Sequence, residues 1–207
     1  MIKEACIENL GEAIKAESEG ASQLELCDRL DLDGSTPTFE TIEEVCSAVN
    51  IPVKVIVNPV PFQYQYSETQ ARNILKTIER LNQYPISGIV FGPLTKEGLP
   101  DLKLIKRVSE HTEYPITFHK AIDQTKNILT NTQAIADHGI VKYILSSGGS
   151  STAEEGSQTL LKMKAILADT PTRLIAAGKV TDINLPALHK RLSLEYYHGR
   201  KIVGSLS

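Results

Sequence analysis

The sequence lacks the features that mark nucleic-acid-binding and membrane-spanning proteins. Its 207 residues carry a formal net charge of −3, and no basic stripe or aromatic-rich basic run is present, which argues against a nucleic-acid surface or a polybasic membrane patch. No uninterrupted apolar stretch approaches the roughly 20 residues that a membrane helix needs. We therefore expect a globular protein whose partners are small molecules, ions or copies of itself.

Cysteine is also scarce. Three cysteines are an odd number without the density of a disulfide scaffold, so Cys6, Cys27 and Cys46 are expected to be reduced thiols. The first residues are strand-like and contain no apolar signal core, which predicts a cytoplasmic location. No Cys-x-x-Cys or His-x-x-His spacing occurs, which argues against a zinc site. Cys46 lies on a helical apolar stripe and is assigned to packing.

Strand-like runs alternate with helix-like stretches along the whole chain. The segments 38–49 and 68–81 show apolar residues at helical spacing, and Ser67 with Gln70 forms a capping-box pattern before the second of them. Eight strands are predicted, at residues 2–7, 24–28, 53–58, 88–93, 115–121, 142–147, 173–177 and 195–199.

Eight strand and helix units predict a parallel sheet, which is either open and doubly wound or closed into a (β/α)8 barrel. Strands of an open sheet read as continuous apolar runs, whereas here one side-chain parity is polar, which favours the barrel. We predict one TIM-type barrel domain over residues 1–207. The chain is short for this fold, so the eighth helix is expected to be missing or vestigial.

A missing eighth helix has a consequence for assembly. The apolar outer faces of the first and last strands would lack a cover and would need a partner. We therefore predict a homodimer or a higher homo-oligomer.

The first two strand-like runs each place a Glu and a Cys two residues apart. Because strand side chains alternate, Glu4 and Cys6 share one face, and so do Glu25 and Cys27. Neighbouring strands of matching parity and similar height would bring the two sulfurs within reach of one soft ion, and two thiolates suit Cu(I). The alternative is that both thiols are small apolar side chains in the core.

A third run brings His119 and Asp123 to the same parity as each other. Together with Glu4 and Glu25 they form a predicted interior cluster in which one carboxyl, with a raised pKa, acts as general acid and another as base. The alternative is a structural hydrogen-bond network. Lys120 has the opposite parity to His119 and is expected to point toward the helices or the rim.

Glycine and polar residues gather after the last three strands. Loops at this end of a TIM barrel frequently bind phosphate through backbone N–H groups, so a small anionic ligand is a candidate here, with turn formation as the alternative. The candidate ligand-binding residues are Ser147, Gly148, Gly178, Lys179, His198 and Gly199.

Several short motifs occur in a recognisable order: Glu4-Ala5-Cys6, Leu24-Glu25-Leu26-Cys27, Gly34-Ser35-Thr36-Pro37, Val90-Phe91-Gly92-Pro93-Leu94 with Gly98 and Asp101, Thr117-Phe118-His119-Lys120-Ala121-Ile122-Asp123, Ser147-Gly148 and Tyr197-His198. In this order they resemble the CutC copper-homeostasis family, from residue 3 to about residue 204. The resemblance implies a compact TIM-type barrel, a cytosolic setting, a homo-oligomer and an association with copper.

The chain departs from the usual pattern of that family at three places. Asn58-Pro59-Val60 stands where members usually have Arg-Pro-Arg, which argues against an oxyanion or phosphate site at the third strand. Lys120 stands in place of an arginine, and Ala177-Gly178-Lys179 in place of a glycine triplet.

Two functions are therefore predicted. The first is a cytosolic copper-homeostasis protein of the CutC type, which binds Cu(I) through Cys6 and Cys27. The alternative is a TIM-barrel enzyme that performs acid/base chemistry, as an isomerase or lyase, on a small anionic metabolite.

Overall fold

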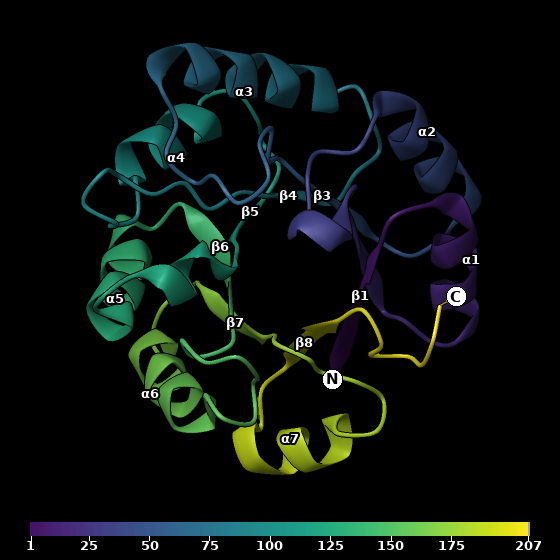
Figure 1. The fold of residues 1–207 in the computed structure, drawn as a ribbon, viewed down its shortest axis with the longest axis vertical. Coiled ribbons are helices and arrows are strands. Elements are labelled where there is room, and N and C mark those ends of the chain that lie inside the picture. The colour runs from purple at the N-terminus through teal and green to yellow at the C-terminus, as the bar shows by residue number, and fades with distance from the viewer. Residues whose placement is uncertain (207) are drawn as a thin grey trace.

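The computed structural model describes residues 1–206. Its eight strands form a closed barrel in chain order, and all neighbouring strands, including β1 and β8, pair in parallel (Figure 1). The predicted (β/α)8 barrel is thereby confirmed. The strands are β1 Ile2–Ile7, β2 Gln23–Leu26, β3 Val53–Ile56, β4 Gly88–Val90, β5 Ile116–Phe118, β6 Val141–Ser146, β7 Arg173–Ala176 and β8 Tyr196–Gly199.

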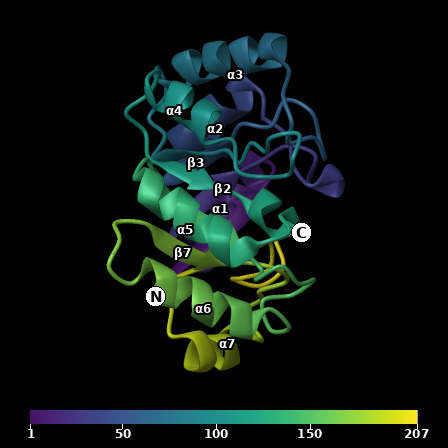
Figure 2. The same ribbon diagram turned by 90° about the vertical axis from the view of Figure 1, so that its left-hand side faces the viewer.

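Seven α-helices lie outside the barrel within the described residues (Figures 1 and 2). They are α1 Leu10–Ser18, α2 Phe39–Ala48, α3 Glu68–Leu81, α4 Leu102–Ser109, α5 Ile128–His138, α6 Ser157–Leu167 and α7 Leu185–Leu192. The predicted capping box starts α3, with Ser67 accepting from the Gln70 N–H and Gln70 accepting from the Ser67 N–H. None of the helices in residues 1–206 combines the length and the apolar character needed to cross a membrane.

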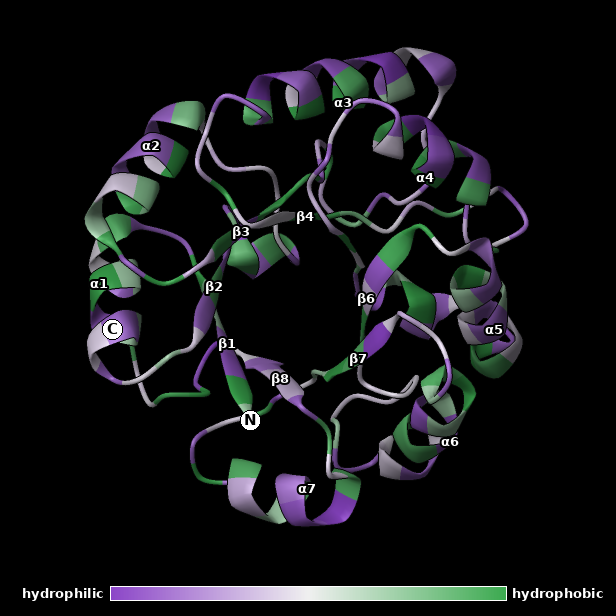
Figure 3. Cartoon of the chain, turned by 180° about the vertical axis from the view of Figure 1, so that it is seen from behind, coloured by the Kyte–Doolittle hydropathy of each residue, from purple (hydrophilic) through white to green (hydrophobic). Residues whose placement is uncertain are grey.

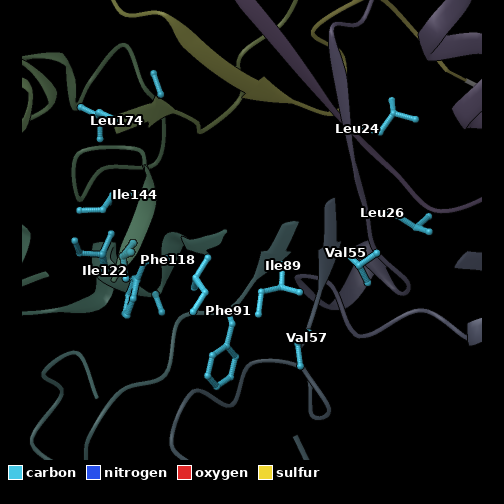
Figure 4. Packing of buried hydrophobic residues seen from close by; sticks show 14 of the residues in the cluster. Leu24, Leu26, Val55, Val57, Ile89, Phe91, Phe118, Ile122, Ile144 and Leu174 are labelled. Atoms are coloured by element: carbon cyan, nitrogen blue, oxygen red, sulfur yellow. The ribbon is translucent and has the colours of Figure 1, made fainter. Parts of the chain in front are cut away.

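The main apolar core lies between the strands and the helices. Side chains of one strand parity, such as Leu24, Val55 and Ile89, are buried against the helices (Figure 4). The helices carry both hydrophobic and hydrophilic residues (Figure 3), and the hydrophobic ones face this layer, because a surface helix buries only one stripe. The other strand parity is therefore free to carry polar groups into the barrel.

Six of the predicted strands end one to three residues earlier than the apolar pattern suggests, and β4 and β5 show the largest differences. β4 stops at Val90 and β5 at Phe118. After β5 the chain turns into a short 3₁₀ helix, η2 Lys120–Gln124. His119 is the residue that caps η2, because its Nδ1 accepts the Ala121 N–H at 3.2 Å. Side-chain alternation ends where the extended backbone ends, so the parity argument does not extend beyond His119.

The expected exposed seam between β8 and β1 is not present, and that prediction was wrong. Figure 1 shows no helix between α7 and α1, yet the outward Ile7 and Tyr197 are fully buried. Tyr197 packs against His189 of α7, and Ile202, Val203 and Leu206 of the segment after β8 belong to the same main core as Ile7 and Tyr197. Arg200 ties this segment to α1 by an ion pair with Glu12 at 3.3 Å.

Replacing Ile202 with Ala tests the role of this segment. Ile202 is fully buried, so we expect a loss of about 2–4 kcal/mol in the free energy of unfolding, as for other buried Ile→Ala changes. Ile183 is 87% exposed, and Ile183→Ala is the matched control, with an expected change within about 0.5 kcal/mol. Urea denaturation measures both, and equal effects would contradict a sealing role for the segment.

Candidate functional site

A cavity of about 120 Å³ opens at the carboxyl end of the barrel strands, the end at which TIM-barrel active sites lie. Its lining comes from the ends of β1, β2, β3 and β8 and from the loops that follow β2, β3 and β5. Five of the predicted site residues line it: Cys6, Glu25, Cys27, His119 and His198. The other lining residues are Leu30, Asp33, Ile56, Asn58, Tyr64 and Lys120.

The two predicted metal-binding cysteines meet in this cavity. Their sulfurs are 3.6 Å apart, both residues are buried, and the Cys27 thiol donates to Glu25 Oε1 at 3.3 Å. Strand alternation accounts for the shared inward direction of Cys6, Glu25 and Cys27. One ligand atom from each of these three residues lies within 4.8 Å of the others. The expectation that the two thiols come together is therefore met.

The two cysteines do not lie side by side in the sheet, however. Cys6 pairs with Glu25, so Cys27 lies two residues further along the chain, just after the end of β2. Strand spacing and rise then separate the two Cα atoms by roughly 8 Å, whereas a disulfide spans at most about 7 Å without backbone movement. The offset places the sulfurs close together but leaves the backbone unsuited to a disulfide, an arrangement that fits a shared ion better.

Cys6, Glu25 and Cys27 shift one another's pKa values. The contact between the two sulfurs lowers the pKa of Cys6 to about 6 against the effect of burial, with further lowering by His198. The same contact and burial raise the pKa of Cys27 well above its usual value. Burial raises the pKa of Glu25 to about 7. The site therefore contains groups that gain or lose protons near neutral pH.

Glu4 lies deeper and is held as a fixed anion. Lys54 Nζ lies 2.7 Å from Glu4 Oε2, and His198 Nδ1 donates to Glu4 Oε1 at 2.9 Å. Burial alone would raise the pKa of Glu4, but Lys54 and His198 lower it to about 2. Both oxygens of Glu4 are therefore bound to neighbouring side chains, which fixes the position of this carboxylate. In contrast, Glu25 Oε2 has no hydrogen-bond partner within residues 1–206.

Lys54 was missed by sequence reasoning. It is buried on β3, and its ammonium lies 4.1 Å from the centre of the Tyr143 ring. The available signal was its position in the run Val53-Lys54-Val55-Ile56, where the lysine has the inward parity and stands opposite Glu25 in the register. A lysine at such a position requires a buried anion.

His198 joins the two carboxylates. Its Nδ1 is 3.7 Å from Glu25 Oε2 in addition to the contact with Glu4. Although burial acts to lower the pKa of His198, Glu25, Cys6 and Glu4 raise it well above its usual value, so the imidazole is charged.

His119 lies on the opposite side of the barrel, after β5. Burial lowers its pKa to about 4, so the ring is neutral. Its imidazole packs against Gly92, where an added Cβ would come within 2.7 Å of the ring carbon Cε1. The lack of a side chain at Gly92 therefore leaves room for the His119 ring.

Asp123 does not join the interior cluster, contrary to expectation. Its carboxylate accepts hydrogen bonds from Ser147 N and Ser147 Oγ and from Gly149 N, all at 2.9 Å, and from Ser146 Oγ. The Gly148 N–H donates to Ser146 Oγ. Asp123 thus occupies the donors of the loop that the sequence suggested for a phosphate. The reason is that η2 redirects the chain after His119.

The remaining candidate residues at this end do not line the cavity. A Cβ on Gly178 would lie 2.7 Å from Ser147 Cβ, and one on Gly199 would lie 2.1 Å from the Val180 carbonyl oxygen. Both glycines therefore permit close contact between neighbouring loops. The Lys179 carbonyl accepts from Asn184 Nδ2 at 3.0 Å.

Two of the positions that depart from the family pattern do border the cavity. Asn58 is buried, and its Nδ2 donates to the Gly34 carbonyl at 2.8 Å, so a neutral side chain links the ends of β2 and β3. Lys120 lines the cavity because it follows the end of β5 and no longer obeys strand parity. Val60 is 37% exposed and does not line the cavity.

The fold and the site together define a (β/α)8-barrel protein with two thiols and a carboxyl gathered at the carboxyl end of its strands. The sequence profile of the CutC family matches residues 1–203. The chain therefore belongs to the CutC family.

Individual relatives agree with this assignment. A CutC family protein of Enterococcus faecalis is 29% identical over 98% of this chain and 100% of its own length. The copper homeostasis protein cutC homolog of Mus musculus is 29% identical over 95% of this chain and 72% of its own length. The crystal structure of the CutC protein of Streptococcus agalactiae superposes with a TM-score of 0.91 at 23% identity, covering 98% of this chain and 99% of that one.

The Glu25→Gln variant tests the electrostatics of the site. Glu25 ionises near pH 4.5 when exposed and near 7 in the folded protein, so the folded state retains a proton that the unfolded chain loses, and stability falls as the pH rises through this range. We expect Glu25→Gln to match the wild type near pH 4 and to exceed it at pH 8 by on the order of 3 kcal/mol. Urea denaturation at the two pH values measures the difference.

A loss of stability of the Gln variant at both pH values would contradict this account. It would show that the Glu25 carboxylate is firmly paired with a cation such as His198.

Proposed function

We propose that this protein is a copper-homeostasis protein of the CutC type that binds Cu(I) through Cys6 and Cys27. The observation that carries the proposal is the 3.6 Å separation of the two buried sulfurs. Thiolates are soft ligands and favour Cu(I) over the harder divalent ions. The name of the mouse relative, a copper homeostasis protein, supports the same metal.

Glu25 is the group best placed to assist the two thiols. Its carboxyl lies with both sulfurs in one cluster, and its Oε2 has no hydrogen-bond partner in the described part of the chain. The charged His198 ring lies 3.7 Å from this oxygen without forming a hydrogen bond to it, and a buried oxygen without a hydrogen bond is costly unless a ligand completes its contacts. A bound cation would also favour the ionised forms of Cys27 and Glu25, whose pKa values are raised without it. Glu4 lies deeper in the barrel, and its two oxygens are already bound to Lys54 and His198, so it supports the site without being free to bind the ion.

Copper uptake under reducing conditions tests the proposal. We expect about one Cu(I) per chain, and loss of this uptake in Cys6→Ser and in Cys27→Ser, because each change removes half of the thiolate pair. Cys46→Ser is the matched control, since Cys46 lies on α2 outside the cavity, and it should bind like the wild type. Metal analysis after gel filtration measures the stoichiometry, and full uptake by the Cys6→Ser/Cys27→Ser double variant would refute the proposal.

We extend the proposal to a cytosolic setting and to self-association. Free thiols persist in reducing compartments, which suits the three unpaired cysteines. Self-association does not require the seam between β8 and β1, which is buried; the exposed Val60 and Phe62 on the β3–α3 loop are alternative contacts. Sedimentation velocity at micromolar concentration should show at least twice the mass of one chain, and a monomer at all concentrations would reject self-association.

A second candidate function is acid/base catalysis on a small anionic metabolite, as an isomerase or lyase. Glu25 and Cys6, with pKa values of about 7 and 6, favour it, because proton transfer is most efficient near the working pH. Such an enzyme would exchange a carbon-bound proton of its substrate with D₂O. Proton NMR of metal-free protein with small organic acids would detect this exchange, and an unchanged rate in Glu25→Gln would rule out Glu25 as the base.

A further inference from the structure

The cavity has two unlike walls, and the metal proposal uses only one of them. Cys6, Glu25 and His198 come from β1, β2 and β8. His119 and Lys120 follow β5, which lies opposite β1 in a closed barrel of eight strands in chain order. The thiol wall and the β5 wall therefore face each other across the opening.

The β5 wall presents a hydrogen-bond donor that nothing satisfies. The Nδ1 of His119 accepts the Ala121 N–H, so in the neutral ring the proton lies on Nε2. His119 is only 8% exposed, and its Nε2 has no hydrogen-bond partner within residues 1–206. Buried donors are rarely left unpaired, and an unpaired one indicates a missing acceptor.

The ring that carries this donor is rigidly placed. The backbone of Gly92 lies against one side of it, and the ring of Tyr64 is centred 5.0 Å away at a tilt of 58°. The Tyr64 hydroxyl is already used, because it donates to Asp33 Oδ2 at 2.6 Å. The donor is therefore fixed in direction, as a recognition group must be.

Lys120, the residue after His119, adds a positively charged side chain to the same wall. Lys120 lines the cavity, and its ammonium has no ion pair or hydrogen bond among the described residues. A cavity of about 120 Å³ holds the volume of about four waters at ~30 Å³ each, so its ligand is limited to a few non-hydrogen atoms. Two unused donors, one of them charged, select an oxygen acceptor with negative charge.

We propose that the cavity binds a small organic monocarboxylate, which accepts the hydrogen bond of His119 Nε2 and pairs with the Lys120 ammonium. Binding of this ligand goes beyond metal binding, because neither His119 nor Lys120 belongs to the thiol cluster. The proposed carboxylate site also lies on a different wall from the loop after β6, because the hydrogen-bond donors of that loop are already bound to Asp123. A carboxylate held here would lie between the β5 wall and the thiols.

Isothermal titration of the metal-free protein with acetate, lactate and pyruvate tests the proposal. Acetamide, the uncharged isostere of acetate, is the matched probe. We expect saturable binding of at least one acid in the millimolar range or tighter, as small ligands of this size permit, and at least tenfold weaker binding of acetamide than of acetate. Absence of saturation by all three acids up to roughly 50 mM would overturn the proposal.

Variants separate the ligand contact from the structural role of His119. Asn is a favourable cap, so His119→Asn keeps the acceptor for Ala121 but does not reach the position of Nε2, and it should bind the acid at least tenfold more weakly. Lys120→Met should weaken binding about tenfold and tests the charge if His119→Asn does not fold. His111→Asn, at the other end of β5, should bind like the wild type.

These results are independent of the copper proposal. His119→Asn should retain the copper uptake of the wild type, since both thiols are unchanged. Equal weakening of acid binding by His119→Asn and His111→Asn, or unchanged binding in both His119→Asn and Lys120→Met, would overturn the β5 wall as the binding surface.

Discussion

The arrangement of this site depends on one buried anion, the carboxylate of Glu4. It lies inside the barrel with no exposure, between the ammonium of Lys54 and the imidazole of His198. Removing charges from water is expensive, and only close partners with good geometry offset the cost. Such a network holds its members in one arrangement, because any displacement would leave a charge unpaired.

The position of every reactive group follows from this anchor. Glu4 holds His198, which faces Glu25 at 3.7 Å and lowers the pKa of Cys6. Glu25 in turn accepts from Cys27, so Cys6 is linked to Glu4 through His198 alone, and Cys27 is linked to it through Glu25 and His198. The charged network is separated from the helices by the apolar layer outside the strands, which provides most of the hydrophobic burial. The apolar side chains that stabilise the fold and the polar side chains that form the site therefore lie on opposite faces of the same strands.

The two walls of the cavity differ in what their residues require. On the thiol wall, soft sulfurs and a carboxyl oxygen without a hydrogen bond suit the cation that we propose. On the β5 wall, the His119 N–H lacks an acceptor and Lys120 adds a positive charge, which suits the anion that we propose. A metal ion and a small carboxylate are complementary in charge, and bound together they would satisfy both walls. Asn58, which follows β3, contributes a neutral side chain to the cavity lining, and Lys120 contributes a positive charge on the β5 wall.

Much of the fold and part of the site could be predicted from local sequence patterns. The alternation of strands and helices, the capping box of α3 and the inward direction of Cys6, Glu25 and Cys27 depend on backbone periodicity, which neighbouring residues determine. The position of Asp123 was predicted wrongly, because β5 ends at Phe118 and η2 turns the chain.

Only the tertiary structure decided which groups meet across the barrel. The contact of Lys54 with Glu4 and the closure of the seam by Ile202 join residues far apart in the chain. The offset between Cys6 and Cys27 depends on the register of β1 and β2. Strand parity states which way a side chain points, but register, strand length and barrel closure decide what it meets, and these are set by contacts between distant segments.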